Sequence, residues 1–144
     1  MEAAPRDLGP TIFHSEDSLL PNSAKYEDSA GRPVGRGKYN TEYIMEDARN
    51  KGGGFNWAAK LCDDYELNGF DDWFLPSRDE LNHMYGNLHM RERGNFRAEK
   101  YWSSTASNNG WGTNFAWAEN FSNGEQDGER GYTVKCRVRP VRQF

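Results

Sequence analysis

The C-terminal third of the chain most constrains its fold, because aromatic residues are mixed there with residues that form turns. Residues 101–144 contain eight of the chain's 20 aromatic residues, together with five glycines, five asparagines and four serines. Glycine, asparagine and serine favour turns, whereas each buried ring removes a large apolar area from water. This mixture predicts short strands with irregular backbone between them, held in place by large rings.

Four short strands are expected in this region, at Tyr101–Ser103, Asn114–Trp117, Glu119–Phe121 and Tyr132–Arg139. Ser122-Asn123-Gly124 is typical of a turn between two strands. The last strand alternates between apolar and basic residues, so its two sides should meet different surroundings.

Two helices are expected before these strands. The first runs from about Trp57 to Leu67, where the apolar residues share one helical face, and Asn68-Gly69 ends it. The second begins after Ser77, because Ser77-Arg78-Asp79-Glu80 has the form of a capping box. Its buried stripe would be Leu81, Met84, Tyr85 and Leu88.

The first 50 residues carry weaker signals. We expect a flexible start over Met1–Pro10, short strands at Thr11–Phe13 and Tyr39–Tyr43, and one or two helical turns over Glu42–Ala48. Helices that come first and short strands that come last predict an α+β fold. A chain of 144 residues suits one domain, which we place at residues 11–144, after a flexible segment 1–10.

Composition excludes several classes of protein. The net charge of −4 argues against broad nucleic-acid binding, which usually needs a basic excess. No apolar run is long enough for a transmembrane helix, so we expect no membrane insertion. No signal peptide is visible in the sequence, and location is left open.

No metal or cofactor site is expected. His14, His83 and His89 lack the spacing of metal ligands. The pairs Asp63-Asp64 and Asp71-Asp72 lie outside any EF-hand pattern and are interpreted as helix-end and turn residues.

Both cysteines are expected to be small core residues. Cys62 falls on the buried face of the first helix and Cys136 on the inward side of the last strand. Nothing near either in sequence would activate a thiol. A disulfide between them remains open.

The basic side of the last strand has two interpretations. Lys135, Arg137 and Arg139, with Arg142 beyond them, could bind an anion such as a sulfated polysaccharide. The alternative, which we favour, is the solvent-exposed face of an edge strand. Its charge would then be neutralised by nearby acidic residues, namely Glu119, Glu125, Asp127 and Glu129.

Three blocks and the C-terminal ending carry a family resemblance. They are Ala58–Tyr65, Asp72–Asn82 with the letters DWFLPSRDELN, Tyr101–Thr105 with YWSST, and Arg137–Phe144 with RVRPVRQF. Together they resemble C-type-lectin-fold domains related to formylglycine-generating enzyme, including the C-terminal domain of the Legionella collagen-like protein. Within that group the chain is most similar to the variable proteins of diversity-generating retroelements. The resemblance implies a C-type lectin fold, with two helices packed on short antiparallel strands and long ordered loops.

The resemblance also implies a ligand-binding protein whose C-terminal segment, residues 101–144, is diversified. In such systems adenines of a template repeat are miscopied into the coding region, so Asn codons become codons for many residue types. Residue types that can arise in this way mark the candidates for variation. They are Ser107, Asn108, Asn109, Gly112, Thr113, Asn114, Ala118, Asn120, Ser122, Asp127, Gly128, Gly131, Tyr132 and Thr133.

A site that accepts many side chains needs a backbone held by other residues. The expected scaffold of the site is Trp102, Trp111, Trp117 and Phe121. A preformed backbone lowers the entropic cost of binding, and Tyr132 would be the strongest single anchor.

The chain departs from its enzyme and lectin relatives. The enzymes use a cysteine pair, whereas this tail contains only Cys136, and the calcium-binding motif of sugar-binding lectins is missing. We therefore expect a non-enzymatic domain that binds a protein. Display on a cell surface or a virion is what the resemblance implies, and the residues themselves leave the location open. The alternatives are a fixed adhesin that binds anionic polysaccharide through its basic strand, and an enzyme similar to the formylglycine-generating group.

Overall fold

Strand β3 (Lys100–Ser107) lies inside a curled sheet of five strands. The computed structural model describes residues 1–14, 31–50, 57–107 and 115–143. The sheet order is β2-β6-β3-β4-β5, with β2 at Leu8–Thr11, β4 at Phe115–Asn120, β5 at Gln126–Arg130 and β6 at Cys136–Val138. Strands β3 and β6 run parallel, and the other neighbours are antiparallel. The sheet is therefore mixed, which corrects the prediction of antiparallel strands alone.

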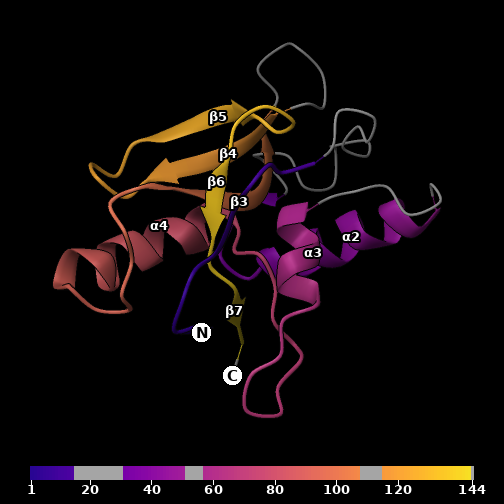
Figure 1. Ribbon diagram of the computed structural model, residues 1–144, viewed down its shortest axis with the longest axis horizontal. Helices are drawn as coiled ribbons and strands as arrows, with labels where there is room; N and C mark the ends of the chain where they lie inside the picture. Colours follow the sequence, from indigo (N-terminus) through magenta and orange to yellow (C-terminus); the bar gives the residue numbers. More distant parts are fainter. Residues whose placement is uncertain (15–30, 51–56, 108–114, 144) are drawn as a thin grey trace.

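Helices lie on either side of strands β3 and β6 in Figure 1. Helices α2 (Gly37–Asn50) and α3 (Trp57–Asp63) pack with Trp102 in one buried cluster. Helix α4 (Arg78–Asn87) packs with Tyr101 and Phe121 in a second cluster, and a short 3-10 helix, His89–Arg91, follows it. Adjacent residues of a strand point to opposite faces, so Tyr101 and Trp102 divide the core in two.

The mixed α+β class is confirmed, whereas the C-type lectin fold stays an expectation. The described residues contain three α-helices, one more than expected. Among them, no helix has the length and apolar character needed to cross a membrane.

Helix α2 corrects the weakest part of the sequence interpretation. Tyr39–Tyr43, predicted as a strand, lies within it, and the expected turns at Glu42–Ala48 are its second half. Its buried residues recur at helical spacing, but the first of them are a glycine and two polar residues, so no apolar stripe marked the helix start. They are Gly37, Asn40, Thr41, Ile44, Met45 and Ala48.

The two predicted helices are present with different boundaries. Helix α4 has the predicted capping box between Ser77 and Glu80. Helix α3 ends at Asp63, earlier than predicted. Asn68 and Gly69 both have positive φ, 54° and 81°, and form a tight turn that pairs Leu67 with Phe70. Their sequence signal is a turn, and it was wrongly assigned to a helix end.

The N-terminal segment Met1–Pro10 contributes strands, which corrects the expectation of a flexible start. Strand β1 (Glu2–Ala3) pairs with β7 (Val141–Arg142), and β2 pairs with β6. Thr11 ends β2, so the predicted strand at Thr11–Phe13 begins earlier. Both ends of the chain therefore belong to the same part of the fold, as Figure 1 shows.

The C-terminal strands differ from the expected ones in length. Strand β3 extends beyond the predicted Tyr101–Ser103, and the two strands predicted around Ala118 form the single strand β4. The turn at Ser122–Gly124 is confirmed. Strand β5 was not predicted because its sequence, QDGER, contains no apolar residue. Only Cys136–Val138 of the predicted last strand is regular.

Candidate functional site

The predicted ligand-facing residues fall into three groups of different exposure. Ser122, Asp127 and Thr133 are exposed, and Asn120, Gly128 and Tyr132 are half-buried, whereas Ser107, Ala118 and Gly131 are buried. Asn108, Asn109, Gly112, Thr113 and Asn114, with the scaffold candidate Trp111, lie outside the described residues. The expectation that these small side chains face outward is therefore wrong for the three buried residues.

Each buried candidate has a packing reason. Ala118 lies opposite Trp102 in the core. A side chain at Gly131 would collide with His14, since its Cβ would lie 2.6 Å from His14 Cδ2. Ser107 occupies the space above Gly128, where an added Cβ would lie 2.4 Å from Ser107 Oγ. Gly128 is thus half-buried but has no room for a side chain unless Ser107 moves.

The exposed and half-buried candidates lie along β5 and the turns at its two ends. Asn120 and Ser122 lie at the turn before it, and Tyr132 and Thr133 at the turn after it. Strand β5 forms the outer edge of the sheet (Figure 1). We call β5 with the turns Ser122–Gly124 and Gly131–Thr133 the β5 surface.

Arg78, at the start of α4, holds the frame beneath this surface. Its guanidinium lies 3.6 Å from the centre of the Trp117 ring, a cation–π contact. Its Nε donates to Gln126 Oε1 at 2.9 Å, and Gln126 Nε2 donates back to the Arg78 carbonyl at 3.3 Å. The Arg78 N–H also donates to Thr105 Oγ1 at 2.9 Å. One residue thus connects α4 with β3, β4 and β5.

The scaffold predicted from the sequence includes Trp117 but not Arg78. The two residues lie far apart in the chain, and no local pattern links them. Of the other scaffold candidates, Trp102 and Phe121 are both buried. The Trp102 ring packs edge-on against Phe13 at 5.3 Å, and its Nε1 donates to the Thr11 carbonyl at 2.8 Å.

Glu119 is a buried carboxyl group next to this frame. It lies on β4 between Tyr101 of β3 and Gln126 of β5, and its relative exposure is 0%. Burial raises the pKa of Glu119 to about 8, and Gln126 and Arg78 lower it only in part. Within the described residues neither carboxyl oxygen has a hydrogen-bond partner. At neutral pH Glu119 is therefore mostly protonated.

The opposite face of β5 carries carboxylates. Glu129 of β5 pairs with Lys100 of β3 at 2.6 Å. The two side chains meet across β4, where Ala118 is small, and this bond raises the pKa of Lys100. Asp127, on the same face, is exposed. This face of the edge strand is therefore negative at its outer end.

Aromatic and basic residues meet at the far end of β5. The Arg130 guanidinium lies 5.5 Å from the Phe115 ring centre and 5.6 Å from that of Tyr132. The Tyr132 ring also lies 5.8 Å from His14. Tyr132 is thus supported on two sides while part of its ring stays accessible.

The basic residues of the C-terminal strand do not form an exposed stripe. Arg139 is fully buried, with Nε bonded to Asp7 at 2.8 Å and further bonds to the carbonyls of Ala4, Gly94 and Asn95. Arg137 bonds Glu99 at 2.5 Å and Arg142 bonds Asp72 at 2.7 Å. Strand β6 lies inside the sheet, so the expectation of an exposed edge strand is wrong. The neutralising partners are also not the predicted ones.

A basic hollow remains beside Arg137. It has a volume of about 340 Å³ and is lined by Arg6, Asp7, Asn95, Arg97 and Arg137. Two of its three arginines come from outside the C-terminal strand, and sequence analysis missed them.

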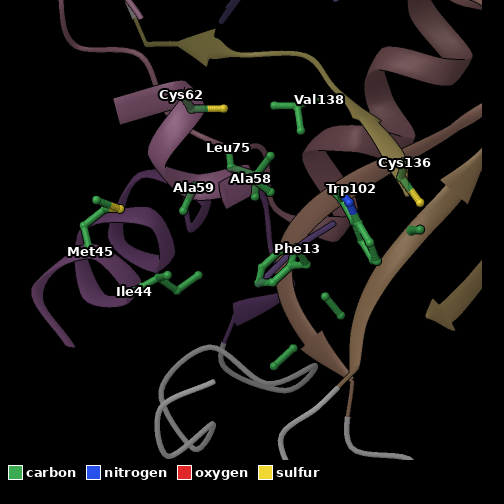
Figure 2. Close-up of a cluster of buried hydrophobic side chains, with 13 residues drawn as sticks. Phe13, Ile44, Met45, Ala58, Ala59, Cys62, Leu75, Trp102, Cys136 and Val138 are labelled. Atoms are coloured by element: carbon green, nitrogen blue, oxygen red, sulfur yellow. The ribbon is translucent and has the colours of Figure 1, made fainter. Parts of the chain in front are cut away.

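The two cysteines are buried and free, as expected for core residues. Burial raises the pKa of both the Cys62 and the Cys136 thiols, so neither is a ready thiolate. Figure 2 shows the two sulfur atoms entering the core from α3 and β6 without meeting. In the described part of the chain, no three His, Cys, Asp or Glu side chains are grouped to hold a metal ion.

A family model described as the Lcl C-terminal domain matches residues 27–142. No curated protein matches the chain.

Proposed function

Because the chain belongs to the Lcl C-terminal domain family, we propose that it is a non-enzymatic domain that binds a protein ligand through the β5 surface. The observation that carries this proposal is the contrast between frame and surface. Arg78, Trp117 and Gln126 hold the strands from below, while exposed Asp127 and half-exposed Tyr132 lie above them. A preformed frame lowers the ordering cost of binding.

Tyr132 is the proposed energetic centre of this surface. Tyrosine is enriched at binding hot spots because it buries a large ring and keeps a polar hydroxyl. Here Arg130 and His14 hold the ring in place before a ligand arrives. Replacing Tyr132 with Ala should weaken ligand binding by tenfold or more, whereas Tyr39→Ala, at an exposed tyrosine of α2, should leave it unchanged.

We further propose that accessible residues of the β5 surface, with Asn120 at the adjoining end of β4, are the diversified ones. These candidates are the exposed Ser122, Asp127 and Thr133 and the half-buried Asn120 and Tyr132. The test is the surrounding DNA, which should carry a near-copy of the tail's coding sequence that differs mainly at adenines, beside a reverse transcriptase gene. If the surrounding DNA contains neither of these, the proposal of diversification is wrong, and the domain would bind its ligand through a fixed surface.

A display library tests the binding surface directly. Randomising the five residues above should yield folded binders to arbitrary protein targets. A matched library randomises five exposed residues elsewhere, namely Lys38, Glu42, Glu46, Glu66 and Asp71. If both libraries yield binders at the same frequency, or if the first library unfolds, the β5 surface is not a dedicated site.

The basic hollow supports a second candidate, the binding of an anionic polysaccharide. Three arginines, together with Asp7 and Asn95, line a hollow of about 340 Å³, and Arg6 and Arg97 are both exposed. Binding to heparin should be salt-sensitive and should fall in the double variant Arg6→Ala, Arg97→Ala. The control is Arg91→Ala, an exposed arginine on the 3-10 helix. If both variants lose heparin affinity equally, the binding depends on net charge alone and not on the hollow.

The enzyme alternative has a simple test. The high thiol pKa values of Cys62 and Cys136 oppose nucleophilic chemistry at neutral pH. Any cysteine-dependent oxidation should disappear in Cys136→Ser, the tail cysteine. An activity abolished by that change in a folded variant would overturn the non-enzymatic proposal.

A further inference from the structure

The outer edge of β5 carries backbone groups that β4 does not use. The Asn120 N–H donates to the Glu125 carbonyl at 2.8 Å across the hairpin. Bonded and non-bonded pairs alternate along an antiparallel ladder, and Gln126, Gly128 and Arg130 are the partners of Glu119, Trp117 and Phe115. These three residues therefore occupy the non-bonded positions, and their main-chain groups point away from β4.

Two of these residues present a complete bonding edge. Gln126 and Gly128 each offer one N–H and one C=O. Within the described residues no strand lies on that side of β5, and no described group bonds to these four atoms. The Arg130 carbonyl, by contrast, already accepts from Val134 at 3.1 Å. The open segment is thus short and ends at a defined turn.

From this geometry we infer that β5 binds an extended basic peptide segment of its protein partner by strand addition. The inference deepens the proposed function and rests on it. Main-chain bonds would supply affinity, and side chains of β5 would supply selectivity. Such a mode suits a surface of changing side chains, because the backbone groups stay the same.

Charge selects the occupant. Asp127 and Glu129 point to one face of β5, and Lys100 pairs with Glu129 but leaves Asp127 exposed. A Lys or Arg placed opposite Asp127 on an added strand would form a favourable cross-strand pair. A second copy of the chain fits poorly, since antiparallel pairing about Gly128 sets Asp127 against Glu129 of the other copy. Like charges directly opposite destabilise a pair.

Gly128 also favours a close approach. It contributes no side chain at the middle of the open segment, and Ser107 fills the face where its Cβ would be. An added strand would meet bare backbone there, with the Arg78–Trp117–Gln126 frame holding β5 from the inner side.

The test is a nuclear magnetic resonance titration of the full chain with a short, end-blocked peptide that alternates threonine and lysine. We expect the amide protons of Gln126 and Gly128 to shift downfield and to exchange more slowly on binding. A peptide with the same side chains, N-methylated along its bonding edge, should bind at least tenfold more weakly. A peptide with glutamate in place of lysine should show a similar loss.

Protein variants separate strand addition from general attraction. Asp127→Lys should weaken binding of the lysine peptide severalfold, whereas Asp71→Lys, an equal change of net charge at an exposed loop residue, should not. Equal binding of the N-methylated peptide, or unchanged Gln126 and Gly128 amides, would overturn strand addition. If partners selected on the β5 surface still bind in that case, the proposed function stands. If the display library yields none, the proposed function fails by itself.

Discussion

Arg139 and Glu119 are both fully buried, but their surroundings differ in kind. Arg139 has Asp7 and three carbonyl groups as partners and the Phe96 ring at 4.0 Å. Glu119 has no hydrogen-bond partner among the described residues. A buried charge is stable only when paired, so Asp7 compensates the Arg139 guanidinium, whereas the unpaired Glu119 carboxyl holds a proton. One group therefore connects segments of the fold, and the other makes stability depend on pH.

Replacing Glu119 with Gln should remove this pH dependence. The pKa of Glu119 is about 8 in the folded protein against 4.5 for an ordinary glutamate. Between these values the folded state binds more protons than the unfolded state, so the free energy of unfolding falls as pH rises. The fall is at most about 1.4 kcal/mol per pH unit. Summed from pH 4.5 to 8, this fall amounts to about 4 kcal/mol, so we expect Glu119→Gln to be more stable than the wild type at pH 8 by about that amount.

Urea unfolding at several pH values from 5 to 9 measures this difference. Glu125→Gln, at an exposed turn residue, is the matched control and should keep the wild-type slope. If the free energy of unfolding changes with pH equally in the wild type and in Glu119→Gln, the Glu119 carboxyl is ionised over the whole range from pH 5 to 9.

Removing the Arg139 side chain should be far more costly than removing that of Arg137. Arg139→Ala removes the closest charge partner of the nearly buried Asp7, which keeps the Tyr101 hydroxyl at 2.8 Å and the more distant Arg137 at 3.9 Å. This loss should cost about 3–5 kcal/mol. Arg137 bonds the half-exposed Glu99 side chain, and such surface pairs contribute about 1 kcal/mol or less. Chemical denaturation of the two variants gives the comparison. Similar losses would mean that the Arg139 cluster adds nothing beyond an ordinary ion pair.

At the scale of elements, α4 and α2 are joined by one carboxylate. Glu80 accepts from the N–H groups of Ser77 at 2.7 Å, Gly37 at 3.1 Å and Gly35 at 3.2 Å. It completes the capping box of α4 and also fixes the start of α2. The lack of a side chain at Gly37 permits this approach, because a Cβ there would lie 2.8 Å from the Ser77 nitrogen.

This double role predicts unequal effects for two adjacent carboxylates. Glu80→Ala leaves three N–H groups without their acceptor and should cost about 3 kcal/mol. Asp79→Ala removes only an exposed pair with Arg32, worth about 1 kcal/mol or less. Thermal unfolding compares the two variants. If Asp79→Ala is the more harmful change, the helix dipole rather than the shared acceptor stabilises this junction.

At the scale of the whole molecule, the two ends of the chain hold each other. Strand β1 pairs with β7, and the Ala4 N–H donates to the Pro140 carbonyl at 2.8 Å. Asp7 bonds both Arg139 and the Tyr101 hydroxyl, the latter at 2.8 Å. The N-terminal residues thus complete the surroundings of two buried side chains from the C-terminal third.

Deleting Met1–Asp7 should therefore destabilise the entire domain. Loss of β1 and of the partner of Arg139 should lower the free energy of unfolding by about 3 kcal/mol or more. Deleting Met1 alone, which is exposed and precedes β1, serves as the control. An unchanged denaturation midpoint in the longer deletion would show that residues 1–7 contribute no stability, as the sequence-based prediction of a flexible start implies.

Features that depend on neighbouring residues can be predicted from the amino-acid sequence alone. The capping box at Ser77, the turn at Ser122–Gly124, the burial of Cys62 and Cys136, and the α+β class all follow from local chemistry or periodicity. Such signals survive because a cap or turn uses residues only a few positions apart.

Which polar residues are buried, and which strand forms the edge of the sheet, depends on contacts made in the folded molecule. Arg139 is buried because Asp7 and the carbonyl of Gly94 meet it there, and β5 is a strand because β4 supplies its ladder. Ala118 and Gly131 are small because Trp102 and His14 occupy the neighbouring space. These outcomes depend on contacts between residues far apart in the chain. Such contacts produce no regular spacing of residue types along the sequence, so no local pattern predicts them.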